Sequence, residues 1–348
     1  MDKSTRVAVA LSGGVDSAVA AALLKNQGWE VVGVYLRLSG VQAPEHLPAL
    51  ARGLEIPLLE VDLRQEFTSW VVDYFVAEYS QGRTPNPCVK CNAAIKFGVL
   101  WERLPELGAD YLATGHYARF IQASGGGTGL WRGKDRPKDQ SYFLAQLPKG
   151  ILPRLLFPLG ELTKPQVKAR YRELGLPRQE DYRESMEVCF IPRGDYREFL
   201  RVRQDCFGAP GELVDTRGRV LGRHRGVECY TVGQRRGLAT PSTEPYYVVE
   251  IRPETNRVVL GRREELLSPG LLAREVNWLI DPPGQEIEAT AVIRYRHPGV
   301  KARLVPLEGR KVRVLFAEPQ AAVAPGQAVA FYERERVMGG GWIAARIR

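Results

Sequence analysis

The stretch Val7-Ala-Val-Ala-Leu-Ser-Gly-Gly-Val-Asp-Ser17 decides how the first half of this chain folds. It begins with five small or branched apolar residues, which are typical of a strand buried on both faces. A turn at Ser12, Gly13 and Gly14 follows, and a helical pattern continues over residues 18–25. A strand, a glycine turn and a helix N-terminus bring free backbone N–H groups and the positive end of a helix dipole to one point. The stretch therefore predicts an anion site, although a glycine turn without a ligand is the plainer alternative.

This turn differs from the common phosphate loop. The Walker A motif places a lysine and a serine or threonine after its second glycine, whereas this chain has Val15, Asp16 and Ser17. A carboxylate repels phosphates unless a divalent cation bridges them, so Asp16 predicts Mg²⁺. The stretch resembles the pyrophosphate loop of ATP pyrophosphatases. That resemblance implies that ATP is split between its α- and β-phosphates and that a substrate is adenylated.

Length and composition describe an ordinary globular protein. A chain of 348 residues is long enough for two or three domains. Its apolar runs are shorter than the roughly 18–20 residues that span a bilayer, and the run after residue 6 is too short for a signal peptide. We therefore expect a cytoplasmic enzyme with no membrane partner. Its five cysteines are then expected to be metal ligands, catalysts or core residues rather than structural disulfides.

The charge pattern favours an anionic partner. Lysine and arginine number 49 against 40 acids, which leaves a net charge of +9. Two basic clusters lie in the second half of the chain: Arg217, Arg219, Arg223, Arg225, Arg235 and Arg236, and then Arg294, Arg296, Lys301, Arg303, Arg310, Lys311 and Arg313. Nucleic acid is the large polyanion that such clusters fit, and a solvated basic surface is the alternative.

The two halves of the chain have different periodicities. Strands are predicted at residues 7–11, 31–36, 58–61 and 110–114, with helices at 65–79 and 93–107, which indicates a parallel sheet covered by helices. From residue 199 onward short strands predominate, at 211–222 as a hairpin, and at 246–251, 258–260, 289–296, 311–316 and 328–332. The sequence thus predicts an α/β + β fold with domains at residues 1–198, 199–268 and 269–348.

The stretch Thr84-Pro-Asn-Pro-Cys-Val-Lys-Cys-Asn92 is the second informative segment. A helix is expected to begin just after Cys91, so that its dipole, with Lys90 and Lys96, favours the thiolate. Cys91 is therefore a candidate nucleophile. Cys189 lies in an apolar, strand-like run, for which burial in a core is the plain interpretation.

The cysteines allow further chemistry. Cys88 and Cys91 have the spacing of half a zinc site or of a redox pair. Cys88, Cys91 and Cys189 together supply three thiolates, enough to hold an iron–sulfur cluster with one open iron. Cys206 and Cys229 have no evident partner in the sequence and are interpreted as structural.

Over essentially its whole length the chain resembles the bacterial and organellar tRNA-specific 2-thiouridylases. The resemblance is carried by the order and spacing of residues 12–17, 84–92 with 95–97, 113–117, 138–144, 160–164, 189–191 and 230–238. It implies an adenine-nucleotide α-hydrolase-like domain followed by a central, tRNA-binding β domain and a C-terminal β-barrel. Some members of the family carry aspartate at the position of Cys88.

The resemblance also implies an activity and a set of residues. The enzyme would adenylate the C2 oxygen of the wobble uridine in tRNA and replace it with sulfur. Cys91 would be the nucleophile and Cys189 the persulfide carrier. The other roles are ATP binding by Ala10, Leu11, Ser12, Gly13, Gly14, Val15, Asp16, Ser17, Leu36 and Gly115; target-base contact by Asn86, Pro87 and Cys88; and tRNA contact by His116, Lys138, Asp139, Gln140, Arg294, Tyr295 and Gln327.

Sulfur would come from a persulfide donor protein, a cysteine desulfurase or a relay. The persulfide on Cys189 can attack C2 directly, or Cys91 can release sulfide from it and form a disulfide with Cys189. Two other functions remain open at this point. One is a different pyrophosphate-loop enzyme, such as a tRNA lysidine synthetase or an amide-forming ligase. The other is an RNA-binding protein with a relict nucleotide site.

Overall fold

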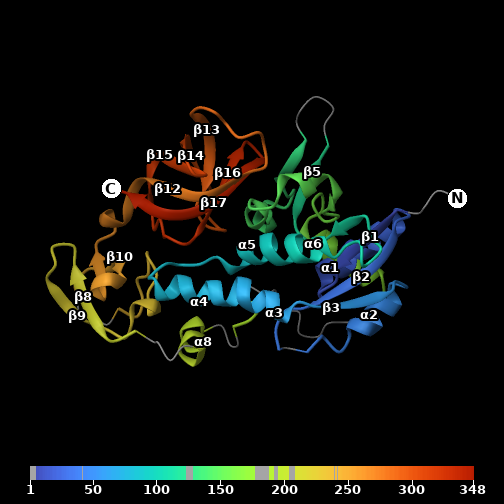
Figure 1. The fold of residues 1–348 in the computed structure, drawn as a ribbon, viewed down its shortest axis with the longest axis horizontal. Helices are drawn as coiled ribbons and strands as arrows, with labels where there is room; N and C mark the ends of the chain where they lie inside the picture. Colours follow the sequence, from blue (N-terminus) through green and yellow to red (C-terminus); the bar gives the residue numbers. More distant parts are fainter. Residues whose placement is uncertain are drawn as a thin grey trace.

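Three β-sheets organise the chain in the computed structural model (Figure 1). The structure describes residues 5–40, 42–122, 128–176, 188–191, 195–203, 208–238, 240 and 242–348. The α/β part and the N-terminus lie on one side of the molecule in Figure 1, the central sheet lies on the other, and the C-terminal barrel lies above the long helices that join them. The predicted α/β + β class is confirmed.

The N-terminal sheet is parallel throughout, in the order β3-β2-β1-β4-β7. Its strands are β1 (Arg6–Ala10), β2 (Glu30–Arg37), β3 (Leu58–Asp62), β4 (Tyr111–Ala113) and β7 (Leu155–Leu156). Successive side chains of β1 point to opposite faces, so Val7 and Val9 enter one core and Ala8 the other. Both faces are thus buried, as the continuous apolar run predicts.

Helices cover both faces of this sheet. One layer holds α1 (Val15–Asn26), α2 (Leu47–Gly53) and α7 (Lys164–Glu173). The other is an almost continuous helical path through α3 (Arg64–Phe67), η1 (Thr68–Val72), α4 (Asp73–Ser80), α5 (Pro87–Cys91), η2 (Asn92–Val99) and α6 (Leu100–Glu102). In Figure 1, α4 and α5 extend from the N-terminal sheet toward the rest of the molecule.

The prediction that a helix begins just after Cys91 is wrong. The helix begins at Pro87, and Asn86 is its N-cap: the Asn86 Oδ1 accepts a hydrogen bond from Val89 N at 3.1 Å. Proline suits the first position of a helix because that position needs no N–H donor. Cys91 is consequently the fifth residue of a continuous helical path. Of the two cysteines, Cys88 is the one that lies in the first turn.

The central sheet has the order β10-β11-β8-β9. Its strands are β8 (Gly211–Asp215), β9 (Val220–His224), β10 (Tyr247–Arg252) and β11 (Arg257–Gly261), and α8 (Tyr196–Arg203) precedes them. β8 and β9 form the predicted hairpin. Asn256 adopts φ of 50° in the turn between β10 and β11, where a short polar side chain is tolerated.

The C-terminal sheet closes into an antiparallel barrel because β12 pairs with both β15 and β17. Its strands are β12 (Leu267–Trp278), β13 (Ile287–Val292), β14 (Val300–Leu307), β15 (Lys311–Ala321), β16 (Ala328–Glu333) and β17 (Arg336–Ile347). The hairpin of β5 (Ala118–Ile121) and β6 (Gly129–Arg132) extends this sheet through β17. A segment of the first half of the chain therefore belongs to the sheet of the last.

The segment around Cys189 also differs from the prediction. Cys189 lies in an exposed turn rather than in a strand. Its apolar neighbours Phe190 and Ile191 anchor this turn, because Phe190 packs edge-on against Phe67 and Phe75. Cys229 is half-buried, and Cys206 lies outside the described residues. No helix within the described ranges is long and apolar enough to cross a membrane.

Candidate functional site

A cavity of about 230 Å³ opens where β1, β2 and β4 end. Ligands in parallel α/β sheets bind beyond the carboxyl ends of the strands. The lining brings together most of the residues predicted to bind ATP: Ala10, Leu11, Ser12, Asp16, Ser17, Leu36 and Gly115. Gly13 and Gly14 of the turn, and Val15 at the start of α1, do not line the cavity. Lys96, His116 and Gln140 also line the cavity.

The pyrophosphate loop is braced by its own side chains. The Ser17 hydroxyl donates to the Gly14 carbonyl at 3.0 Å and accepts from Ser12 N at 3.2 Å. Gly13 has φ of +86°, and a Cβ there would lie 3.2 Å from Pro44 Cγ. Gly115 is needed for a different reason, because a Cβ there would lie 2.9 Å from the Asp16 carbonyl carbon. The end of β4 therefore packs directly against the loop.

Asp16 is held by a lysine from a distant part of the chain. Lys164 Nζ donates to the two Asp16 carboxylate oxygens at 2.7 and 2.6 Å, and the Tyr117 hydroxyl donates to Oδ1 at 2.8 Å. Lys164 is only 6% exposed and stands at the start of α7. The Walker A motif carries a lysine that this loop lacks. Lys164 is its counterpart, and it is supplied by α7 rather than by the loop itself.

This arrangement bears on the predicted Mg²⁺. Both carboxylate oxygens of Asp16 already accept hydrogen bonds, and the charge of Lys164 balances its own. The residues described here contain no group of three or more His, Cys, Asp or Glu side chains placed to hold a metal ion. The side chains around Asp16 therefore do not by themselves form a magnesium site.

Replacing Lys164 with methionine should lower the free energy of unfolding by about 2–4 kcal/mol, because it leaves the partly buried Asp16 carboxylate without its cation. Lys168→Met is the matched control, since Lys168 lies on the same helix and is exposed. Thermal and urea unfolding measure the difference. Equal midpoints for the two variants would show that the ion pair contributes nothing.

Three thiols lie beyond the Lys96 side of the cavity. Cys88 and Cys91 are on α5, and Cys189 comes from the exposed turn. Desolvation raises the pKa of Cys91 to about 12 and also raises the pKa values of Cys88 and Cys189, while the positive charge of Lys96 acts in the opposite direction on all three. Cys91 is therefore a thiol at neutral pH, contrary to the thiolate that a helix N-terminus would favour.

The predicted cluster site can be tested against the same geometry. The three cysteines act on one another electrostatically, so they share one region. They are nevertheless free thiols, and they are not among any described groups of three side chains that could hold a metal ion. The three-thiol set thus does not form a cluster site in this conformation.

The barrel forms hydrogen bonds with the segment that precedes Cys88 and Cys91. Gln327 Nε2 donates to the Pro85 carbonyl at 3.1 Å, and Asn86 Nδ2 donates to Gln327 Oε1 at 3.3 Å. Thr84 N donates to the Pro325 carbonyl at 2.7 Å. Asn86 is buried, so the two residues predicted to contact base and tRNA here, Asn86 and Gln327, meet each other across the domain junction.

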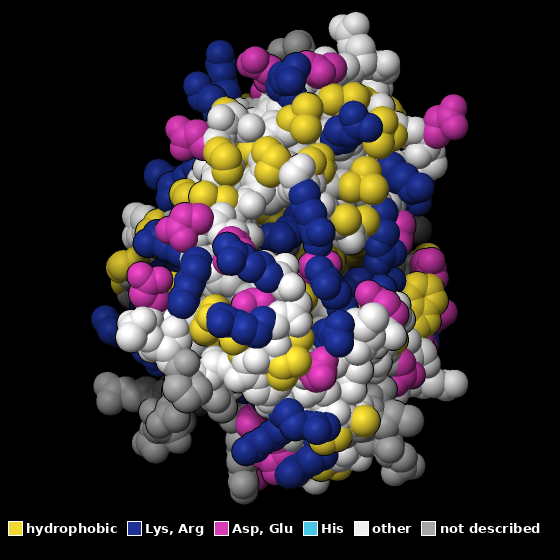
Figure 2. Space-filling model, turned by 90° about the vertical axis from the view of Figure 1, so that its left-hand side faces the viewer, with side chains coloured by type: hydrophobic (Ala, Val, Ile, Leu, Met, Phe, Trp, Pro, Cys, Tyr) yellow, Lys and Arg dark blue, Asp and Glu magenta, His cyan; other side chains and the backbone are white. Residues whose placement is uncertain are grey.

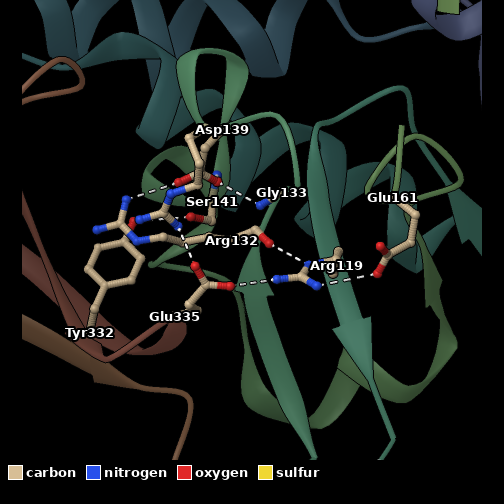
Figure 3. A network of polar contacts seen from close by, with 9 residues as sticks. Arg119, Arg132, Gly133, Asp139, Ser141, Glu161, Tyr332 and Glu335 are labelled. Atoms are coloured by element: carbon tan, nitrogen blue, oxygen red, sulfur yellow. Dashed lines mark hydrogen bonds and ion pairs between the residues drawn. The ribbon is translucent and has the colours of Figure 1, made fainter. Parts of the chain in front are cut away.

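The predicted tRNA contacts Lys138, Asp139 and Gln140 have different surroundings in the folded chain. Asp139 is 8% exposed and faces inward, where its carboxylate pairs with Arg132 at 3.0 Å and accepts hydrogen bonds from Gly133 N and Ser141 N (Figure 3). Its contact with tRNA stays a prediction, and the structure gives it the role of holding this loop in shape.

Figure 3 also shows how this loop is joined to the barrel. The Arg132 guanidinium lies 3.7 Å from the centre of the Tyr332 ring, and Arg119 of β5 pairs with Glu335 at 2.9 Å. Tyr332 belongs to β16, and Glu335 precedes β17. The loop at residues 138–141 is therefore fixed from both the N-terminal part and the barrel.

Gln140 and His116 both face the nucleotide cavity. Gln140 Oε1 accepts a hydrogen bond from Tyr117 N at 3.0 Å. Burial, with the charge of Lys96 as the smaller cause, lowers the pKa of His116 well below its usual range, so its imidazole is neutral. Contact of these two side chains with tRNA stays a prediction.

The remaining predicted tRNA contacts lie on the barrel. Arg294 is exposed, and Tyr295 packs against Phe143 with the rings tilted by 38° and their centres 4.5 Å apart. Every member of the two predicted basic clusters is exposed. On the face shown in Figure 2, many lysine and arginine side chains lie among scattered acids.

Sequence reasoning missed the pairing of Lys164 with Asp16 and the place of Tyr117. Both residues fall within the segments that carry the family resemblance, but no spacing in the sequence links positions 16, 117 and 164. In the sequence, Lys96 is a charge near Cys91 and part of the 95–97 segment of the family resemblance, and its place in the wall of the cavity comes from the structure.

The fold and the cavity define a nucleotide-binding α/β domain joined to two β domains. Family models match in the same order: a tRNA methyl transferase HUP domain over residues 5–193, a tRNA methyl transferase PRC-barrel domain over 198–262 and an aminomethyltransferase β-barrel domain over 268–343. The chain is 46% identical to the tRNA-specific 2-thiouridylase MnmA of Carboxydothermus hydrogenoformans over 98% of each chain. It is also 46% identical to that of Geobacter metallireducens, over 98% of this chain and 97% of the relative.

This chain belongs to the tRNA-specific 2-thiouridylase family. Among solved structures, a 4-thiouridine synthetase–RNA complex with bound ATP is 17% identical and covers 49% of this chain and 41% of its own, with a TM-score of 0.30.

Proposed function

We propose that this chain is an ATP-dependent tRNA-uridine 2-sulfurtransferase, which converts the wobble uridine to 2-thiouridine. The observation that carries the proposal is that the pyrophosphate loop and the helical path of the cysteines line the same cavity. The loop contributes Ser12 and Asp16 to its lining, and the helical path that contains Cys88 and Cys91 contributes Lys96. The near full-length identity to named 2-thiouridylases supports the same reaction.

Adenylation makes the replacement of oxygen feasible, because a uracil carbonyl oxygen is a poor leaving group. In the first step the C2 oxygen attacks the α-phosphorus of ATP, and the α–β bond breaks with pyrophosphate as the leaving group. Backbone N–H groups at the start of α1, together with Ser12 and Ser17, are placed to bind the charge that develops there.

Sulfur transfer then uses two cysteines. A donor protein loads Cys189 with a persulfide; its exposed position supports such access. The terminal sulfur attacks C2 and AMP leaves. Cys91 next attacks Cys189 Sγ, so that the bond between the two sulfurs breaks, 2-thiouridine is released and a Cys91–Cys189 disulfide forms. An external thiol returns the two electrons that reset the enzyme. In the other route, Cys91 attacks first and the released sulfide attacks C2.

Mg²⁺ and an iron–sulfur cluster enter no step of this proposal. Asp16 is paired with Lys164, and the three thiols do not form a metal-holding group. Both groups stay predictions from the sequence, as do the cytoplasmic location and the donor protein.

tRNA is the proposed partner of the exposed basic clusters. Phosphate contacts from such arginines supply sequence-independent affinity. The target base has to leave the anticodon stack to enter the cavity. The junction of Asn86 with Gln327 lies where the barrel meets the cysteine helix, so we propose that a tRNA held by the barrel presents its base there. A lysidine synthetase-like reaction would give the paired cysteines no task.

An assay on the purified chain tests this function. Unmodified tRNA, Mg-ATP and a persulfide donor are mixed, and AMP, pyrophosphate and the thionucleoside in digested tRNA are measured together. We expect the three products in equal amounts. AMP without thionucleoside, or neither product, would contradict the proposed reaction.

A further inference from the structure

Lys96 lies in the wall that separates the nucleotide cavity from the thiols. It belongs to η2, which continues directly from the α5 helix of Cys88 and Cys91. It lines the same cavity as Ser12 and Asp16 of the pyrophosphate stretch, together with His116. A single side chain thus faces both the place where ATP is cleaved and the place where sulfur is transferred.

The local helix geometry holds Lys96 in this position. η2 is a π-helical segment, whose wider turn is frequent at functional sites. The flanking residues Ile95 and Phe97 are 0% and 1% exposed, so the core fixes the backbone on either side. A Cβ at Gly98 would lie 2.9 Å from the Ala93 carbonyl oxygen. The turn around Lys96 therefore depends on a glycine at position 98.

Unlike Lys164, the other lysine of the site, Lys96 has no ion-pair or hydrogen-bond partner in the part of the chain that the structure describes. Lys164 is paired with Asp16. Lys96 is half-buried, and no carboxylate or hydrogen-bond acceptor within the described residues contacts its ammonium. A partly buried, unpaired charge is costly, and an anionic ligand in the cavity would remove that cost.

The groups on which the Lys96 ammonium acts indicate which part of the ligand it would contact. Lys96 acts electrostatically on Cys88, Cys91, Cys189 and His116. In the proposed reaction the pyrophosphate loop binds the leaving pyrophosphate, so the α-phosphate is the phosphate that the target base attacks and that a charge near the thiols would meet.

We propose that Lys96 is a catalytic residue whose ammonium binds the α-phosphate of ATP. It stays with that phosphate while the bond to the uridine C2 oxygen forms and the bond to pyrophosphate breaks. It then balances the negative charge on AMP as the C2–O bond breaks and the electron pair leaves with AMP. This inference rests on the proposed function and adds a residue to it.

The test compares Lys96→Gln with Lys96→Arg and Lys90→Gln. Lys90 is a matched control, because it lies on the adjoining α5 and places its ammonium 5.5 Å from the centre of the Tyr74 ring, away from the cavity. Pyrophosphate release from radiolabelled ATP, which accompanies adenylation of the uridine, is followed in a single turnover with tRNA and without a sulfur donor. We expect Lys96→Gln to slow it by about 10²- to 10³-fold, Lys96→Arg to restore part of the rate, and Lys90→Gln to leave it unchanged.

A second readout separates this role from a purely structural one. Lys96→Gln should also raise the pH at which Cys189 reacts with an alkylating reagent, with its thermal midpoint equal to that of Lys96→Arg. Unchanged pyrophosphate release in Lys96→Gln would overturn the proposal, even if thiolation slowed. An equal loss in Lys90→Gln would overturn it as well. Unaltered enzyme that forms AMP without thionucleoside would instead contradict the proposed function.

Discussion

Cys91→Ser is expected to lower the rate of thionucleoside formation by about 10³-fold or more, because a hydroxyl cannot break the sulfur–sulfur bond at Cys189. Pyrophosphate release in a single turnover should stay within a few-fold of normal, since adenylation precedes the attack of Cys91 in both routes. Burial raises the pKa of Cys91 to about 12, so the thiolation rate of the unaltered enzyme should rise with pH above neutrality. Nucleoside analysis of the digested tRNA measures the first effect.

Cys229→Ser is the control for this change. Cys229 is half-buried in the central domain, far along the chain from the site, and its replacement should leave both products unaltered. Full thiolation by Cys91→Ser would contradict the role of Cys91 as the nucleophile.

Asp16→Asn is expected to slow AMP formation by about 10²-fold or more while tRNA binding is retained. The change removes the negative charge of the Asp16 carboxylate. Both oxygens of that carboxylate accept hydrogen bonds from Lys164, and one also accepts a hydrogen bond from the Tyr117 hydroxyl. The loop and α7 then lose their common anchor. The basic clusters that would hold tRNA lie in the central sheet and the barrel, so binding measured by filter retention should not change.

The control for Asp16→Asn is Asp62→Asn. Asp62 also ends a strand of the same sheet, but it is exposed and paired with its neighbour Arg64. The Asp62→Asn variant should form AMP at the normal rate. Normal AMP formation by Asp16→Asn would instead favour an RNA-binding protein whose nucleotide site is a relict.

Local patterns explain what the sequence could predict. The first strand, its glycine turn and the helix after it follow from residues adjacent in the chain, and the structure has them as β1, the loop and α1. The hairpin of β8 and β9 is equally local. Asn86 followed by Pro87 is also a local signal for the true start of the cysteine helix, which differs from the predicted start after Cys91.

Long-range pairing explains what the sequence could not predict. Lys164 reaches Asp16 across 148 positions, and no periodicity encodes such a contact. The β5–β6 hairpin joins the barrel sheet through a single bridge from Arg336 to Trp131. Cys189 was misplaced because the apolar residues after it indicate a strand, whereas in the structure they anchor a turn against Phe67 and Phe75.

The most direct measurement follows one oxygen atom. tRNA with oxygen-18 at C2 of the wobble uridine is converted by the purified chain with Mg-ATP and a persulfide donor, and the released AMP is weighed by mass spectrometry. If the C2 oxygen is adenylated and then displaced by sulfur, each AMP carries one oxygen-18 and the thionucleoside carries none. Unlabelled AMP beside labelled nucleoside would contradict this chemistry.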